Sequence, residues 1–362
     1  MKVAFAYMGN IHIPLRTLFK ELGIELIVPP PPNKKTLALG VQHAPETMCI
    51  PFKITLGNII NALNLGADTI LHTTGFWSCR FGYYGKLYTY IAKELGYKFT
   101  HIDFCADRLL AHFQLIKKIN KNSNVLAVNA ISRAIYKAWR KSTIMDFMEK
   151  TAREVRPFEV SKGKTTKILA NYLSQLDNTH RVDEMNALKK SFIEEIKNVP
   201  KDLCRPILKI KIVGESYCVI EPFVNFNLIQ VLGEQGIYVD PFLTAHKWLG
   251  FHSIRYGYRE RKRIKKLARP YWKYNVGGED ENAVGYTLLA KEQGFDGVIA
   301  LHPFGCMSSN AVQAVLQKIS NEKDIPFLDI GLDEHTSETG FYNRIDAFIS
   351  VLEKRKKLNY RT

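Results

Sequence analysis

Strand and helix patterns alternate near each end of this chain of 362 residues. In the first hundred residues, short apolar runs alternate with segments of helical periodicity that end at glycine. The expected strands are 2–7, 24–28, 68–72 and 98–105, and the expected helices are 14–22, 51–65 and 87–95. A strand–helix–strand order is typical of a parallel sheet with helices on both faces. The N-terminal part therefore predicts an α/β lobe.

The C-terminal part repeats this rhythm without a residue-level repeat. The expected strands are 207–213, 237–239, 295–301 and 326–330, and the expected helices are 223–232, 281–293, 311–319 and 341–353. Between the two parts, apolar residues recur at helical spacing and glycine is rare, which predicts a helical region. The expected organisation is α/β, with an N-terminal lobe over 1–106, a helical region over 107–200 and a C-terminal lobe over 201–362.

Composition limits the environment in which this chain works. No uncharged apolar run approaches the ~20 residues of a membrane helix, and the start of the chain lacks a signal-peptide pattern, so we expect a cytoplasmic protein. Six cysteines without a C-x-x-C pair do not indicate a disulfide framework or a zinc ribbon. The net charge of +16 indicates an acidic partner, an anionic substrate or simply a lysine-rich composition.

Three cysteines, Cys49, Cys79 and Cys306, lie in loops where the strand and helix patterns meet. In an open parallel sheet, loops at the carboxyl ends of the strands converge on one crevice. Cys49 and Cys306 also precede expected helices, whose N-termini favour a thiolate. Three thiolates in one crevice can hold an iron–sulfur cluster. The alternative is that each cysteine is a small buried apolar residue.

The remaining cysteines are weaker candidates. Cys105 ends an expected strand and is a candidate fourth ligand, with core packing as the alternative. Cys204 and Cys218 are interpreted as structural.

Cys79 lies among aromatic residues that could keep water away from a cluster. They are Trp77, Phe81, Tyr83 and Tyr84.

Several polar residues follow expected strands and are candidates for proton delivery. They are Glu215, after the strand 207–213, and Glu334 and His335, after the strand 326–330. For Glu334 and His335, a helix cap with surface charges is the alternative interpretation. His302 is a candidate hydrogen-bond partner of a cluster sulfur or of substrate, and a core histidine is the alternative.

A basic segment and a phosphate-loop-like segment require separate interpretation. Residues 255–273 contain nine basic residues interleaved with tyrosine and tryptophan, a composition that nucleic-acid-binding surfaces share. A solvated loop or helix is the preferred interpretation, and a docking site for an acidic protein or for coenzyme-A-like phosphates is a third. Residues 161–166 (SKGKTT) lack the first glycine of a P-loop, since Phe158 occupies that position. No G-x-G-x-x-G motif predicts a dinucleotide site either.

Three segments together resemble the 2-hydroxyacyl-CoA dehydratase superfamily. They are ETMCIPFK at 46–53, GESY at 214–217 followed by PFVN at 222–225, and HPFGCM at 302–307 followed by DEHT at 333–336. The similarity is greatest to its activase-related, double-cubane-cluster branch. It spans nearly the whole chain, and the last segment is the most specific. Ser308 stands where the family often has proline, and the middle region matches weakly.

The resemblance implies two Rossmann-like lobes with an iron–sulfur cluster between them, held by Cys49, Cys79 and Cys306. In the family this cluster is a [4Fe–4S] cluster or an [8Fe–9S] double cubane. Electrons come from a separate ATPase activator that carries its own [4Fe–4S] cluster, and members act as homodimers or heterodimers. We further expect Lys53 or Arg80 to balance cluster charge, and His302 and Gly305 to line the cofactor site.

The sequence therefore predicts an oxygen-sensitive iron–sulfur protein. It would accept low-potential electrons from an ATP-dependent activator and reduce, or reductively dehydrate, a small substrate such as an acyl-CoA. A reductase or a 2-hydroxyacyl-CoA dehydratase-like enzyme fits this description. The alternatives are a two-lobed, non-redox protein that binds a small ligand and a basic nucleic-acid-binding protein.

Overall fold

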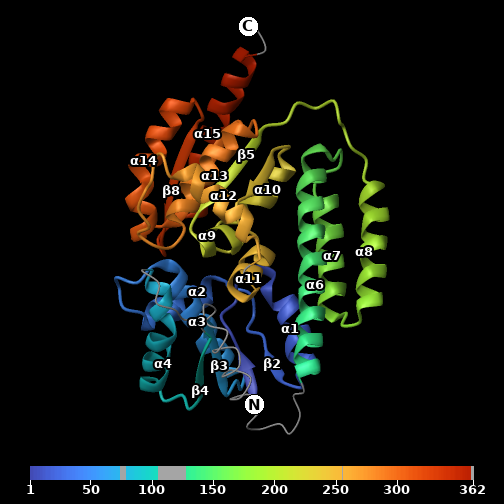
Figure 1. Cartoon of the computed structure of the whole chain (residues 1–362), viewed down its shortest axis with the longest axis vertical. Helices are drawn as coiled ribbons and strands as arrows, with labels where there is room; N and C mark the ends of the chain where they lie inside the picture. The colour runs from blue at the N-terminus through green and yellow to red at the C-terminus, as the bar shows by residue number, and fades with distance from the viewer. Residues whose placement is uncertain (74–78, 105–127, 255, 360–362) are drawn as a thin grey trace. The chain divides into compact units, whose positions relative to one another are not determined.

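The structure is a computed structural model that describes residues 1–73, 79–104, 128–254 and 256–359 (Figure 1). Trp77, Cys105 and Arg255 lie outside the described residues. The chain divides into two compact units. Unit 1 comprises 1–145, 174–188 and 245–256, and unit 2 comprises 146–173, 189–244 and 257–362. Each unit contains a parallel sheet, which confirms the α/β class with two Rossmann-like lobes.

The sheet of unit 1 has the order β2-β1-β3-β4, and its described strands all run parallel. The strands are β1 (Lys2–Ala4), β2 (Glu25–Ile27), β3 (Thr69–Thr73) and β4 (Thr100–Phe104). The described helices of this unit, apart from those of the middle region, are η1 (Gly9–Ile11), α1 (His12–Glu21), α2 (Lys34–His43), α3 (Ile50–Asn64), η2 (Arg80–Tyr83), α4 (Tyr84–Glu94) and α11 (Ala245–Ile254).

Both faces of this sheet are covered, as its sequence pattern predicts. Val3 of β1 packs in a cluster with Phe19 of α1. The next residue, Ala4, packs in the cluster that contains Phe52 of α3 and Tyr88 of α4. Neighbouring residues of a strand point to opposite faces, so the two clusters lie on the two sides of the sheet. The Cys49 end of α3 is thereby anchored on the core.

The sequence analysis missed helix α2 of unit 1. It crosses α3 at two glycines: a Cβ atom on Gly40 would lie 1.6 Å from the carbonyl oxygen of Lys53, and one on Gly57 would lie 2.1 Å from that of Thr36. Backbones can approach this closely only where side chains are missing. The crossing therefore fixes α2 against the first half of α3, and Cys49 follows a helix rather than a strand.

The sheet of unit 2 has the order β6-β5-β7-β8, and its described strands are also parallel. The strands are β5 (Lys209–Gly214), β6 (Tyr238–Pro241), β7 (Gly297–Pro303) and β8 (Phe327–Leu332). The described helices, apart from those of the middle region, are α9 (Ser216–Ile220), α10 (Leu228–Glu234), α12 (Tyr258–Ala268), α13 (Asp280–Glu292), α14 (Met307–Lys323) and α15 (Glu338–Asn359).

The strand β7 is buried along its whole length, which agrees with its continuous apolar sequence. At its start, a Cβ atom on Gly297 would lie 2.9 Å from the ring of Phe348, so α15 packs directly against the backbone of the strand. At the end of β5, Gly214 has a φ of 124° and lies against the backbone of Leu301. This glycine lets the chain leave the sheet and places Glu215 at the carboxyl ends of the strands.

One helix predicted in this part begins later than expected. The segment 223–232 reads as helical, but the chain has positive φ values of 52° at Phe226 and 58° at Asn227, and α10 starts only at Leu228. The prediction was wrong for the first half of the segment because apolar spacing does not reveal a left-handed turn. Tyr342 stabilises this turn by donating to the carbonyl of Phe226 at 2.6 Å.

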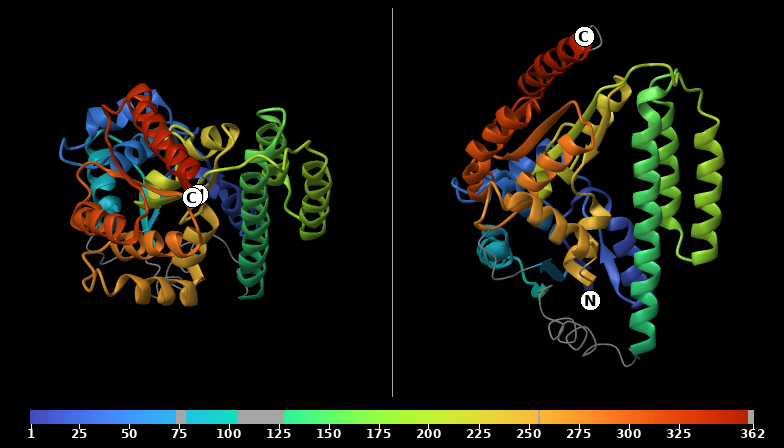
Figure 2. Two further views of the ribbon diagram at one scale, coloured as in Figure 1. Left: turned by 90° about the horizontal axis from the view of Figure 1, so that it is seen from above. Right: turned by 45° about the horizontal axis from the view of Figure 1, so that its top comes forward.

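The middle region consists of the helices α6 (Val128–Val155), η3 (Arg156–Phe158), α7 (Lys164–Asn178) and α8 (Val182–Lys197). In Figure 2 the long helices run side by side. In unit 2, the rings of Tyr172 and Phe192 meet edge to face, with centroids 5.4 Å apart, and join α7 to α8. Each unit includes part of each long helix.

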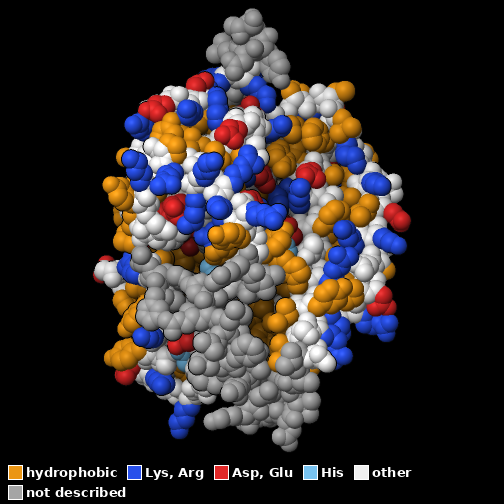
Figure 3. Space-filling view, in the orientation of Figure 1, with side chains coloured by type: hydrophobic (Ala, Val, Ile, Leu, Met, Phe, Trp, Pro, Cys, Tyr) orange, Lys and Arg blue, Asp and Glu red, His pale blue; other side chains and the backbone are white. Residues whose placement is uncertain are grey.

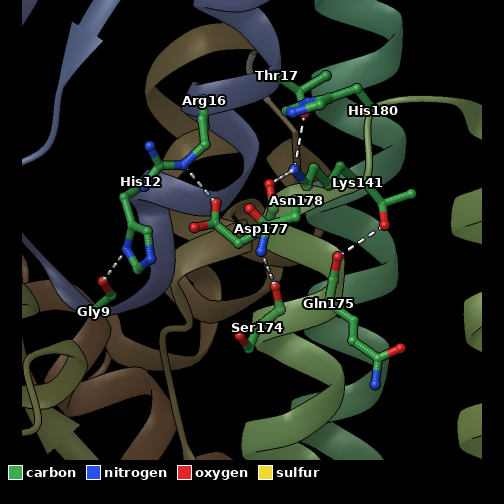
Figure 4. A network of polar contacts seen from close by, with 11 residues as sticks. Gly9, His12, Arg16, Thr17, Lys141, Ser174, Gln175, Asp177, Asn178 and His180 are labelled. Carbon is green, nitrogen blue, oxygen red and sulfur yellow. Dashed lines mark hydrogen bonds and ion pairs between the residues drawn. The ribbon is translucent and has the colours of Figure 1, made fainter.

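Within unit 1, the middle region is fixed to α1 by a polar network (Figure 4). The amine of Lys141 is buried and donates to Thr17 Oγ1 at 2.9 Å and to the carbonyl of Asp177 at 2.8 Å. Arg16 donates to the carboxylate of Asp177 at 2.9 Å. Burial lowers the pKa of Lys141 to about 7, with the charges of Arg16 and Lys20 lowering it further and that of Asp177 opposing them.

No helix among the described residues is both long enough and apolar enough to cross a membrane.

Candidate functional site

The three candidate cysteines share one local geometry. Cys49 immediately precedes α3, Cys79 precedes η2 and Cys306 precedes α14. Each has an extended backbone, with φ between −75° and −69°, and none uses its side chain to cap the helix that follows. The first turns of α3 and α14 retain the partial positive charge that favours an anionic sulfur. This confirms the helix-start geometry expected for Cys49 and Cys306, and Cys79 shares it.

Cys49 and Cys79 lie in two loops of unit 1 that are joined to each other. The Tyr84 hydroxyl lies 2.6 Å from Sγ of Cys49. Burial raises the pKa of Tyr84 well above its usual value, and thiolate charge on Cys49 and on Cys79 raises it further. Both sulfurs are therefore within electrostatic reach of one phenol. The loops are also joined directly, because Arg80 donates to the carbonyl of Thr47 at 3.0 Å.

Aromatic residues surround Cys49. Phe52 stacks on Tyr88 and meets Tyr84 edge to face, both with centroids 4.9 Å apart. His72 packs against the same tyrosines, and burial lowers its pKa to about 4, so it is neutral at pH 7. Of the aromatic residues expected beside Cys79, Phe81 joins this cluster through His72, whereas Tyr83 is 59% exposed.

The two cations expected in this region have different environments. Lys53 lies in the first turn of α3 and is buried. Arg80 is exposed and spans the two cysteine loops through its bond to Thr47. Lys53 follows Cys49 by four positions in the sequence, and Arg80 directly follows Cys79. Their proposed role in balancing charge remains a prediction.

In unit 2, Cys306 follows the buried strand β7 through a short exposed loop. Its sulfur accepts a hydrogen bond from Ser309 Oγ at 3.3 Å and lies 3.4 Å from Ser308 Oγ. A Cβ atom on the exposed Gly305 would meet no other atom within 4 Å. Phe304 is also exposed, although it is large and apolar. The loop therefore presents its sulfur beside two hydroxyl groups.

His302 lies at the end of β7 and is held in a defined orientation. Its Nε2 lies 3.1 Å from both carboxylate oxygens of Asp329 on β8, and its Nδ1 lies 2.9 Å from the carbonyl of Pro303. Burial lowers the pKa of His302, but the hydrogen bond and charge of Asp329 outweigh this and raise it overall. Gln313 fixes Asp329 by donating to it at 2.6 Å.

Glu215 lies at the same end of the sheet as His302, and its charge reaches that ring. Its carboxylate caps α9 by accepting from the backbone of Tyr217 at 3.1 Å and of Cys218 at 2.9 Å. A second carboxylate, Glu279, interacts electrostatically with Glu215. The sequence analysis missed Glu279, because it follows a glycine pair in an irregular segment rather than a strand.

Glu334 and His335 lie in the turn after β8. Asp333 organises this turn by accepting hydrogen bonds from the backbone of His335 at 3.0 Å and from Thr336 Oγ1 at 2.8 Å. The side chain of His335 is exposed and that of Glu334 is half-buried. Their role in proton delivery remains a prediction.

Two known families match this chain in succession. Residues 84–352 match the family described as 2-hydroxyglutaryl-CoA dehydratase, D-component, and residues 4–72 match the CoA enzyme activase uncharacterised domain. The first match covers most of the chain.

The chain belongs to the 2-hydroxyglutaryl-CoA dehydratase D-component family.

This membership confirms the resemblance to the 2-hydroxyacyl-CoA dehydratase superfamily. No curated protein matches the chain. Cys306 lies in the D-component match, Cys49 in the activase-domain match, and Cys79 between the two.

The donor set suits the cluster that the resemblance implies. Soft thiolate ligands select iron–sulfur clusters, zinc and copper(I), whereas oxygen ligands select magnesium and calcium. Within the described residues, no three His, Cys, Asp or Glu side chains gather as a metal-binding group. Cys49 and Cys79 belong to unit 1 and Cys306 to unit 2. The three-cysteine ligand set of this D-component protein therefore remains a prediction.

The two competing motifs have structural explanations in this family member. The backbone N–H groups of Gly163 and Thr165, in the P-loop-like segment, donate to the buried carboxylate of Glu159 at 2.7 and 2.8 Å. These N–H groups therefore already have a hydrogen-bond acceptor within the protein.

Basic residues gather over the α12 region in Figure 3, but this helix buries Ile264 and Ala268 on its inner face. This pattern fits the solvated-helix interpretation.

Proposed function

We propose that this D-component protein is an iron–sulfur protein whose cluster is held by Cys49, Cys79 and Cys306. The observation that carries the proposal is the contact of Cys49 with the hydroxyl of Tyr84, together with the bond from Arg80 that joins the Cys79 loop to the Cys49 loop. Two thiols that precede helices, in loops joined in this way, are suited to act as thiolate ligands of one cluster. Cys306, with its two serine hydroxyls, would supply the third.

When bound, such a cluster would take up and pass on a low-potential electron. Tyr84 and Ser309 would donate hydrogen bonds to ligand sulfurs, and the rings of Phe52 and Tyr88 would exclude water. Exclusion of water disfavours the added negative charge and so lowers the potential, whereas hydrogen bonds to sulfur raise it. The reduction potential of the cluster would therefore depend on the balance of these two opposing effects.

Unit 2 would supply the proton chemistry. His302 has a raised pKa and is oriented by Asp329, so it is a candidate proton donor. Glu215 lies at the same end of the sheet, and Glu334 and His335 are the weaker candidates. A reduced or dehydrated substrate must receive a proton, and these residues lie at or just after the carboxyl ends of strands in this unit.

The electron source that fits this family is a separate, ATP-dependent activator with its own [4Fe–4S] cluster. We infer that the chain acts with it in trans, as a homodimer or heterodimer in the cytoplasm. The substrate would be a small molecule, such as an acyl-CoA, that is reduced or reductively dehydrated. The net charge of +16 favours association with an acidic partner or substrate.

The deciding experiment is anaerobic purification with iron and acid-labile sulfide measured per chain. The wild type and the Cys204→Ala control should contain both in similar amounts, because Cys204 is exposed and lies outside the proposed set. Cys49→Ala, Cys79→Ala and Cys306→Ala should each lose most of the iron. Unchanged iron in all three variants, or an iron-free wild type, would exclude the proposal, and the latter would favour a non-redox ligand-binding protein.

A further inference from the structure

The basic surface over α12 in Figure 3 includes a stripe of cations that the rest of the described chain does not neutralise. Residues at spacings of three and four lie on one side of a helix, here the side opposite the buried Ile264 and Ala268. All members of this stripe are exposed, and their side chains form no ion pair or hydrogen bond with another described residue. The members of the α12 stripe are Arg259, Lys262, Lys266 and Arg269.

The cations of α12 that face its neighbour α13 are compensated by acids of that helix. Lys265 pairs with Glu281 at 2.6 Å, and Arg263 pairs with Glu292 at 3.7 Å. The charges on this side are therefore balanced within unit 2, whereas those of the α12 stripe are directed to the solvent. The sequence thus separates cations that join two helices from cations that remain available to a partner.

The α12 stripe reduces the stability of the helix that carries it. Lys262 and Lys266 are four residues apart, and Arg259 precedes Lys262 by three. Like charges at these spacings are neighbours on the helix surface and repel each other. An anionic partner would relieve this repulsion, so the stripe favours the binding of one.

The aromatic residues near the stripe favour a protein over a nucleic acid as the anionic partner. Tyr271 donates to Glu322 at 2.9 Å, and Trp272 donates through Nε1 to Asp280 at 3.0 Å, so both rings are held by unit 2 itself. Binding of single-stranded nucleic acid uses a series of free rings on which bases stack. Tyr258, at the start of α12, is 65% exposed, and a single exposed tyrosine beside arginine is typical of protein interfaces.

A second copy of this chain is a poor occupant of the same face. A two-fold interface centred on the α12 stripe would place the stripes of both subunits against each other, and their charges would repel. The net charge of +16 adds a longer-range repulsion between copies. An acidic surface on a different protein has the complementary charge.

Helix α12 is connected to Cys306 through contacts within unit 2. A Cβ atom on Gly285 of α13 would lie 2.5 Å from the carbonyl oxygen of Ile264, so α12 and α13 pack closely. Just before α13, a Cβ atom on Gly278 would lie 2.6 Å from Ser308 Oγ, which lies 3.4 Å from Sγ of Cys306. A protein bound to the α12 stripe would therefore be joined to the proposed ligand by one intervening helix.

We propose that the α12 stripe is a docking surface for an acidic protein, with Tyr258 as an aromatic contact at its start. This inference rests on the proposed function, under which the docked protein is the separate ATP-dependent activator. Exposed charges act mainly on the rate of encounter and on its dependence on salt. The stripe would therefore steer the acidic face of the activator to this helix.

The test measures binding of a purified [4Fe–4S] activator ATPase to the full chain under anaerobic conditions. The stripe variant carries Arg259→Gln, Lys262→Gln and Lys266→Gln. The control variant loses the same charge at other exposed positions of unit 2, through Lys162→Gln, Lys164→Gln and Lys167→Gln. Glutamine is as good a helix former as lysine and arginine, so both variants should keep the fold, which circular dichroism checks.

At about 50 mM salt the stripe variant should bind the activator about 10-fold more weakly than the wild type, and the control variant should stay within about 2-fold. The difference should shrink at about 500 mM salt, because exposed charges are then screened over a few ångströms. A short DNA duplex is measured in the same way as a competing polyanion.

A wild type that does not bind the activator, or equal binding by the stripe and control variants, would overturn the docking surface. Tighter binding of the DNA duplex than of the activator would overturn it in favour of a nucleic-acid surface. Iron is measured in the same samples, so the two proposals fail separately. Iron without stripe-dependent binding excludes the docking surface alone, and stripe-dependent binding to an iron-free chain excludes the cluster alone.

Discussion

The phenol of Tyr84 and the thiol of Cys49 are in hydrogen-bond contact at 2.6 Å, although 35 residues separate them in the chain. Removing this contact should lower the cluster potential, because a hydrogen bond to sulfur stabilises the more negative, reduced state. A bond of about 1 kcal/mol corresponds to about 40 mV for one electron, so Tyr84→Phe should shift the potential by tens of millivolts. Anaerobic redox titration measures the shift.

Tyr88→Phe is the matched control for that experiment. Tyr88 lies in the same aromatic cluster, but its hydroxyl contacts Thr55 Oγ1 rather than a cysteine. Its potential should therefore stay close to the wild-type value. Equal shifts in the two variants would show that general disturbance of the cluster, and not the bond to Cys49, sets the potential.

Gly57→Ala should destabilise the protein strongly. The added methyl group would lie 2.1 Å from the carbonyl oxygen of Thr36, so α2 and α3 would have to separate. We expect a loss of at least ~3 kcal/mol in the free energy of unfolding, measured by denaturant titration. Gly305→Ala is the control, because its methyl group would meet nothing within 4 Å and should change stability by less than ~0.5 kcal/mol.

The same Gly305→Ala variant tests the role expected for Gly305 at the cofactor. If the cofactor approaches the loop closely, the variant should lose iron while its stability is unchanged. Full iron content would show that Gly305 only connects β7 to α14.

Stability should depend on pH through Lys141. Its folded-state pKa is about 7, whereas the unfolded chain keeps the ordinary value of 10.5. Between these values the unfolded state binds more protons, so the free energy of unfolding should rise with pH, by up to ~1 kcal/mol per unit. Urea titrations from about pH 7 to 9 should show a smaller slope for Lys141→Met. A slope identical to the wild type, or an equal change in the exposed Lys150→Met, would contradict this.

His302 should titrate at lower pH when its partner is removed. Asp329 lies 3.1 Å from Nε2, so Asp329→Asn should lower the pKa of His302, as NMR of the ring protons would report. Because the folded-state pKa is raised, the stability from this pair is present below the ordinary histidine pKa and is lost as pH rises through the folded value. Asp346→Asn, at an exposed position, should leave the His302 titration unchanged.

The alternation of strands and helices could be predicted because it depends on local periodicity. Helices α3, α13 and α14 and the strands of both sheets lie close to their expected positions. Helix α2 could not be predicted in this way, because its contact with α3 is made by glycine backbones and leaves no apolar stripe in the sequence. Left-handed residues at Phe226 and Asn227 likewise have no periodic signature.

The parts of the candidate site that could be predicted are those that depend only on residue type and on where a helix begins. Cys49 and Cys306 precede helices as expected. Hydrogen bonds between residues far apart in the sequence could not be identified beforehand, such as that of Cys49 with Tyr84 and that of His302 with Asp329.

The bond from Arg80 to the carbonyl of Thr47 ties together two loops that arrive from different parts of the chain. When two cysteine ligands are already held close together, binding of the second one costs less loop-closure entropy, so the pair gains a chelate advantage. Arg80 would then assist assembly by preorganising Cys49 and Cys79, and its neutral analogues should slow cofactor insertion even where they leave the finished centre intact.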